Sequence, residues 1–80
     1  MPLSPIRVRR MILQQFQNAI VSGIVGQGGR VFGEFTSDEF VGVPVPDRLT
    51  RLRERIREPL GPEAVYLGTI VPLAPGEKAF

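Results

Sequence analysis

The stretch from Asp47 to Gly61, DRLTRLRERIREPLG, constrains the fold more than any other part of this chain. At about 100° per residue, its aliphatic side chains fall into one stripe along a helix. These side chains are Leu49, Leu52, Ile56 and Leu60. Asp47 is a suitable N-cap, and Gly61-Pro62 ends the periodicity. We therefore predict a helix from Arg48 to about Leu60 that packs its stripe on an apolar core.

The arginines of this predicted helix divide into two groups. One shoulder of the helix carries Arg48, Arg51 and Arg55, and the other carries Arg53 and Arg57. Between the shoulders runs an acidic ridge, formed by Asp47, Glu54 and Glu58. Two interpretations remain open. The arginines form a solvated face that pairs with its own acids, or the shoulder of Arg48, Arg51 and Arg55 binds phosphate or an acidic partner.

The remaining pattern predicts an α+β domain with element order α-β-β-α-β. Ser4-Pro5 starts a first helix over residues 5–18. Two β-branched runs, 19–25 and 30–36, flank the glycine-rich loop 26–29 and predict a hairpin in which Val25 pairs with Arg30 and Gly23 with Phe32. A third strand is predicted over 64–73, followed by a loose tail over 74–80.

The simplest packing of these elements is a three-stranded sheet with both helices on one face. The last strand follows a helical crossover, which allows it to run parallel to one hairpin strand. The whole chain, residues 1–80, is then a single small domain. The side chains expected in its core are Val8, Ile12, Phe16, Val21, Phe35, Leu49, Leu52, Ile56 and Leu67.

Composition excludes several classes of site. The 80 residues include no cysteine and no histidine, so disulfides, thiolate nucleophiles, imidazole bases and Cys/His zinc sites are all ruled out. Ten basic and eight acidic residues give a net charge of +2, which is too balanced to indicate nucleic-acid binding. The longest apolar run, residues 19–25, is too short to span a bilayer. We expect a cytoplasmic protein with no membrane partner.

Two short motifs invite a functional interpretation. The sequence GQGG at 26–29 matches the G-x-x-G of KH domains, but it joins two predicted strands, where a hairpin turn is the simpler explanation. The TSDE segment at 36–39 brings Asp38 and Glu39 together near Glu34. A turn with capping side chains explains these oxygens, and a catalytic or ligand-binding role of Asp38 and Glu39 is the alternative.

Three segments carry a resemblance to a known family. They are the Ser-x-x-Phe-x-Gly pattern of Ser37, Phe40 and Gly42, the helix-like RMILQQFQNA at 10–19, and the last predicted strand with its flank, 64–75. Together with the element order, they resemble the BolA family of small cytoplasmic domains with a class II KH-like fold. The resemblance covers residues 8–75 and implies that fold and a role in binding another macromolecule.

The same comparison shows where this chain departs from that family. Arg48 occupies the position before the family's usual histidine, but Leu49 follows it. The family's second histidine, early in the last strand, ligates an iron–sulfur cluster shared with a monothiol glutaredoxin, and this chain has Val65-Tyr66 there. We therefore expect no cofactor and no bound cluster.

Three functions follow as hypotheses. The first is a non-enzymatic module that binds a protein partner as a regulator. The second is a nucleic-acid-binding protein that uses Arg48, Arg51 and Arg55. The third is a small ligand-binding or catalytic subunit that uses Asp38 and Glu39. An open sheet edge also favours a homodimer.

Overall fold

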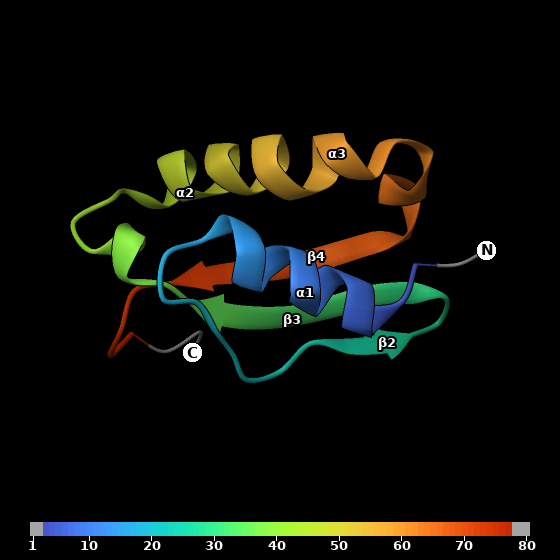
Figure 1. The fold of residues 1–80 in the computed structure, drawn as a ribbon, viewed down its shortest axis with the longest axis horizontal. Coiled ribbons are helices and arrows are strands. Elements are labelled where there is room, and N and C mark those ends of the chain that lie inside the picture. Colours follow the sequence, from blue (N-terminus) through green and yellow to red (C-terminus); the bar gives the residue numbers. More distant parts are fainter. Residues whose placement is uncertain (1–2, 78–80) are drawn as a thin grey trace.

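The structure is a computed structural model that describes residues 3–77. It is an α+β fold in which two long helical segments pack against a mixed sheet (Figure 1). The N-terminal helix α1 (Pro5–Gln15) crosses in front of the strands in this view. The Ser4 hydroxyl caps it by accepting a hydrogen bond from the Ile6 N–H at 3.2 Å. Pro5 occupies the first turn, where no backbone donor is needed.

Four strands form the sheet, with β3 (Arg30–Thr36) at its centre. Both β1 (Ile20–Val21) and β2 (Val25–Gln27) pair antiparallel with one side of β3. On its other side, β4 (Leu67–Leu73) runs parallel to β3. The first predicted hairpin strand is therefore divided into two short strands, because residues 22–24 leave the ladder between β1 and β2.

The predicted hairpin loop is wrong in length and in register. Gln27 pairs with Arg30, so the turn consists of Gly28 and Gly29 alone, with φ of 60° and 79°. Two consecutive residues with positive φ are typical of a two-residue hairpin turn whose backbone matches the twist of the flanking strands. Phe32 is consequently paired with Val25 and not with Gly23.

The second helical segment runs from Val45 to Leu60 and contains a π turn. It consists of α2 (Val45–Leu52), η2 (Arg53–Arg57) and α3 (Glu58–Leu60). It begins earlier than predicted, with Pro44 and not Asp47 at the N-cap position. Pro59 explains the π turn, since its ring has no N–H and would clash with the carbonyl four residues earlier.

The π turn changes which side chains point inward. The buried residues of this segment are spaced by four: Arg48, Leu52, Ile56 and Leu60. In a regular helix, residues spaced by four rotate about 40° around the helix axis at each step. The π turn has more residues per turn, so it cancels part of this rotation and keeps the four side chains on one face. Leu49 is therefore 48% exposed, and its predicted place in the core is wrong. Arg48 occupies the inward position.

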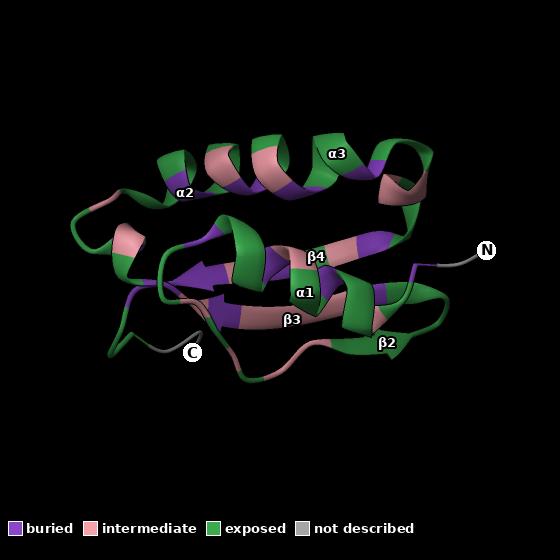
Figure 2. Cartoon of the chain, viewed as in Figure 1, coloured by how far each residue is buried: buried purple, intermediate pink, exposed green. Residues whose placement is uncertain are grey.

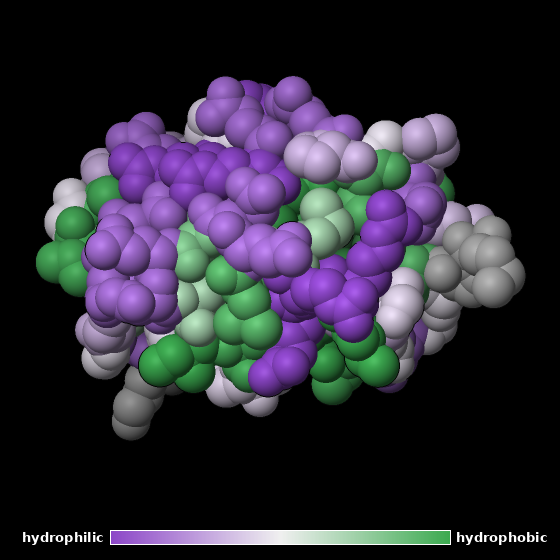
Figure 3. Space-filling model, in the orientation of Figure 1, coloured by the Kyte–Doolittle hydropathy of each residue, from purple (hydrophilic) through white to green (hydrophobic). Residues whose placement is uncertain are grey.

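The start of the last strand and two residues of the predicted core differ from the prediction. The last strand begins at Leu67, because Gly61–Tyr66 form a 3₁₀ helix, η3, where the prediction had placed strand from residue 64. Of the predicted core, Val21 is only partly buried. The confirmed core residues are Val8, Ile12, Phe16, Phe35, Leu52, Ile56 and Leu67. Figure 2 shows that the buried parts of the helices face the sheet, whereas β2 is exposed throughout. Figure 3 shows hydrophilic residues along the top of the same view, where the second helical segment lies.

Candidate functional site

Arg48, which was expected on an exposed shoulder, is buried. Its side chain is only 7% exposed, and its guanidinium lies 5.7 Å from the centroid of the Phe40 ring. Its Nε donates to the Val43 carbonyl at 2.7 Å, and its terminal nitrogens donate to both carboxylate oxygens of Glu77 at 2.5 and 3.0 Å. All of this places Arg48 inside the fold, so its predicted exposure is wrong.

The same contacts give the start of the predicted loose tail a fixed position. The Glu77 carboxylate also accepts a hydrogen bond from the Ala74 N–H at 2.9 Å, and Ala74 itself is buried. The hydrogen bonds from Arg48 and from the Ala74 N–H lower the pKa of Glu77 to about 2. Residues 74–77 are therefore ordered by the ion pair, and residues 78–80 lie outside the described part of the chain.

Acid should remove the contribution of this ion pair to stability. Because the folded state lowers the pKa of Glu77 from its ordinary 4.5 to about 2, the contribution is fully present above pH 4.5. It is lost as the pH falls from 4.5 to about 2. We expect Glu77→Gln to be less stable than the unchanged protein at pH 6 and equally stable near pH 2, as measured by urea unfolding across this range. A difference between the two proteins that is constant with pH would contradict the ion pair.

Arg51 and Arg55 converge on one carboxylate, that of Glu39. Arg55 donates to both oxygens of Glu39 at 2.8 and 2.9 Å, and Arg51 donates to one of them at 3.2 Å. Arg55 also stacks over the Phe16 ring at 5.0 Å and donates to the Gln15 carbonyl at 3.1 Å. The two arginine side chains are 35% and 34% exposed. They connect the second helical segment to α1 and to the 3₁₀ helix η1 (Asp38–Phe40), and a role in partner binding remains a prediction for both.

The acidic pair Asp38 and Glu39 does not form a shared site. Burial raises the pKa of Glu39, but the hydrogen bonds from Arg55 and from the Gln17 N–H, with the charges of Arg55 and Arg51, hold it below its usual value. Asp38 instead accepts a hydrogen bond from the Asn18 amide at 2.7 Å. Since both carboxylates are occupied by different partners, the geometry offers no pair for acid–base work.

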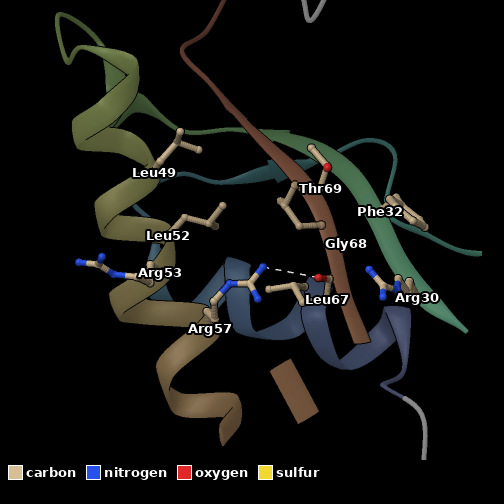
Figure 4. A pocket seen from close by; sticks show the side chains of 10 residues that line it. Arg30, Phe32, Leu49, Leu52, Arg53, Arg57, Leu67, Gly68 and Thr69 are labelled. Atoms are coloured by element: carbon tan, nitrogen blue, oxygen red, sulfur yellow. Dashed lines mark hydrogen bonds between the residues drawn. The ribbon is translucent and has the colours of Figure 1, made fainter. Parts of the chain in front are cut away.

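A groove lies between the second helical segment and β4 (Figure 4). Its volume is about 390 Å³. The helix contributes Leu49, Leu52, Arg53 and Arg57, and β4 contributes residues 67–70. Arg30 and Phe32 of β3 complete its lining. The sequence pattern did not predict this groove, although Arg53 and Arg57 belong to the second arginine shoulder of the predicted helix.

The charges that line the groove are all positive. Three guanidinium groups and no carboxylate belong to its lining. Arg57 donates to the backbone carbonyls of Ala64 at 3.3 Å and Leu67 at 3.5 Å, the second of which is drawn in Figure 4. Arg53 pairs loosely with Glu58 at 3.6 Å, and both side chains are more than half exposed. Because exposed pairs are weak, the groove retains a positive potential.

Apolar residues form part of the groove lining. The Phe32 ring lies against Gly68, where a Cβ would come within 2.6 Å of the ring. A residue with any side chain at position 68 would therefore displace the ring. The aliphatic wall contains Leu49, nearly half exposed, whose unexpected position follows from the π turn. The arrangement can hold an extended ligand that carries both negative charge and apolar groups.

The Ser-x-x-Phe-x-Gly residues serve the fold. The buried Ser37 hydroxyl donates to the Gln17 carbonyl at 2.6 Å and accepts from the Glu39 N–H at 3.3 Å. Phe40 is fully buried against Phe16 and Phe35, and Gly42 has φ of 73°. These three residues shape the connection between β3 and α2.

Comparisons with models of protein families, with curated proteins and with solved structures found no match to this chain. Across residues 3–77 no helix is long and apolar enough to cross a membrane. Within the same range, no three Asp or Glu side chains are grouped so as to hold a metal ion. The functional argument therefore depends on the surface of the molecule itself.

Proposed function

We propose that this chain is a small non-enzymatic binding module, and that its groove receives an acidic segment of a partner protein. The observation that carries the proposal is the lining of three arginines without a carboxylate, beside exposed aliphatic surface. Arginine forms paired hydrogen bonds with carboxylates, which suits it to hold an acidic segment. The proposal moves the binding role from Arg48, Arg51 and Arg55 to Arg53 and Arg57.

The lining favours a protein segment over a nucleic acid. Single-stranded nucleic acids bind largely by stacking successive bases on several aromatic rings. This groove contains one aromatic ring, Phe32, which already packs on Gly68. Its other apolar residues are aliphatic, namely Leu49, Leu52, Leu67 and Ile70. Aliphatic walls with arginines at the rim suit acidic and aliphatic side chains in alternation.

The likeness to the BolA family is part of this proposal. An initial helix, a hairpin, a second helix and a final strand parallel to β3 of the hairpin support a class II KH-like arrangement. The absence of histidine and cysteine separates the chain from the cluster chemistry of that family. The role that we propose in common with that family is binding of another protein.

A pull-down with matched charge variants tests the proposed function. The groove variant is Arg53→Glu with Arg57→Glu, and its control is Arg9→Glu with Arg10→Glu on the exposed side of α1. Both variants change the net charge by the same amount. We expect the unchanged protein and the control to retain a partner from native lysate that the groove variant loses, because reversed charges repel an acidic segment.

Nuclease treatment separates the two candidate partners. Retention of the partner after nuclease supports a protein. Loss of all bound material after nuclease, with binding to generic RNA or DNA that weakens steeply with salt, would replace the proposal with nucleic-acid binding. Equal losses from the groove variant and its control would show diffuse charge attraction and contradict a specific groove.

A further inference from the structure

The sheet face opposite the helices carries a regular set of side chains. Since Val31 and Phe35 of β3 are buried under the helices, alternation places Arg30, Phe32 and Glu34 on the other face. Cross-strand pairing adds more side chains to this face. They are Val25 beside Phe32, Val71 beside Glu34, and Ile20 beside Thr36.

This face is apolar at its centre and uncovered. Val25 is 55% exposed and Ile20 is 67% exposed, and Phe32 and Val71 are half-buried. Figure 1 shows α1 on the side of β3 and β4 that faces the viewer, and Figure 4 shows the strands from the other side, with α1 behind them. A sheet with one helix-covered face and one apolar open face has surface left to bury.

Charge on this face is self-complementary. Arg30 and Glu34 each lie two residues from Phe32, in opposite directions along β3, at about 7 Å. Among the described residues, neither forms an ion pair within the chain. A twofold axis that lies between two such sheets and crosses β3 at right angles at Phe32 would place Arg30 of each copy over Glu34 of the other. Two equivalent ion pairs would result. The alternative twofold axis, along β3, would instead place Arg30 over Arg30.

We infer that this face is the interface of a homodimer in which two sheets pack face to face, with their β3 strands antiparallel about a twofold axis at Phe32. In this arrangement Phe32 meets Phe32, Val25 meets Val25, and two Arg30–Glu34 ion pairs flank the aromatic centre. The same patch serves both copies, as a twofold interface requires. Sheets packed in this way cross at about 30°.

The dimer proposal does not rest on the proposed function of the groove, although the two surfaces share residues. Arg30 and Phe32 line both surfaces, so a groove ligand that reaches β3 competes with the second copy. Arg53 and Arg57 lie on the helix, outside the dimer face. The variant with both of these changed to glutamate should therefore dimerise normally, and failure of one proposal leaves the other intact.

Charge reversal tests the pairing. Sedimentation equilibrium from about 10 µM to about 1 mM should show a concentration-dependent dimer of the unchanged protein. Arg30→Glu and Glu34→Arg should each weaken dimerisation at least about tenfold, because each places like charges opposite one another. The two changes combined should restore the affinity to within about threefold, since the ion pairs re-form with reversed polarity. Glu54→Arg, with the same charge change as Glu34→Arg but on the exposed helix surface, should have no effect.

The absence of cysteine allows a second measurement. Val25→Cys should form a disulfide-linked dimer under mild oxidation, because Val25 meets its own copy beside the axis. Val41→Cys, at a valine that is 67% exposed on another surface, should form no disulfide-linked dimer at the same concentration. A monomeric unchanged protein at about 1 mM, no rescue by the double reversal, or equal cross-linking of both cysteine variants would each overturn the inference.

Discussion

Replacing Phe35 with alanine is expected to remove most of the free energy of unfolding. Phe35 is fully buried, and its ring lies 5.0 Å from the centroid of Phe16 and 5.8 Å from that of Phe40. Emptying such a site costs about 3–5 kcal/mol. A domain of this size is stabilised by about 4–12 kcal/mol in total, so the variant keeps only a small margin.

Urea unfolding monitored by circular dichroism measures this loss. Phe32→Ala is the matched control, because Phe32 lies on the open face of the same strand and is only half-buried. We expect the control to lose clearly less stability than Phe35→Ala. Equal losses from the two variants would contradict the assignment of the two faces of β3.

Gly33→Ala is expected to be about as damaging, for a different reason. The backbone of β3 at Gly33 lies against the segment that leaves the ladder between β1 and β2. A Cβ at Gly33 would collide with the Gly23 carbonyl oxygen and come within 2.7 Å of the Ile24 Cα. Gly33 also has φ of 156°, a conformation that side chains disfavour. Backbone atoms cannot move aside without breaking strand pairing, so we expect a loss of at least about 3 kcal/mol.

Gly23→Ala is the control for this prediction. Nothing lies within 4 Å of a Cβ at Gly23, so its loss should stay within about 1 kcal/mol. Thermal unfolding of both variants provides the comparison. If Gly33→Ala had the same melting temperature as the unchanged protein, residues 23 and 24 would not lie against β3 at Gly33.

The sequence was sufficient to predict the order of helices and strands, but not the division of the first strand, several element boundaries or the hairpin register. Alternation and helical spacing depend on side chains alone, so Val8, Ile12 and Phe35 were correctly placed in the core. The hairpin register depended on which of the four loop residues adopt positive φ. Gly26, Gly28 and Gly29 can all adopt positive φ without a steric cost, so the sequence does not distinguish among them. Several glycines in one loop leave its length undetermined.

The candidate site could not be predicted because one π turn rotates part of a helix. Treating residues 48–60 as a regular helix placed Leu49 inside and Arg48 outside, and the structure has the reverse. The available signal was Pro59, whose missing N–H and ring favour a wider preceding turn. The groove itself depends on β4 lying beside that helix, which no local pattern reveals.

Chemical-shift mapping tests the groove most directly. We would titrate isotope-labelled protein with a peptide of alternating glutamate and leucine and follow the backbone amides by NMR. The largest shifts are expected at Leu49, Arg53, Arg57 and Thr69, with weaker binding after Arg53 and Arg57 are changed to glutamate. Shifts centred on Arg9 and Arg10 of α1, or on Arg51 and Arg55, or spread evenly over all basic residues, would contradict the groove as the binding site.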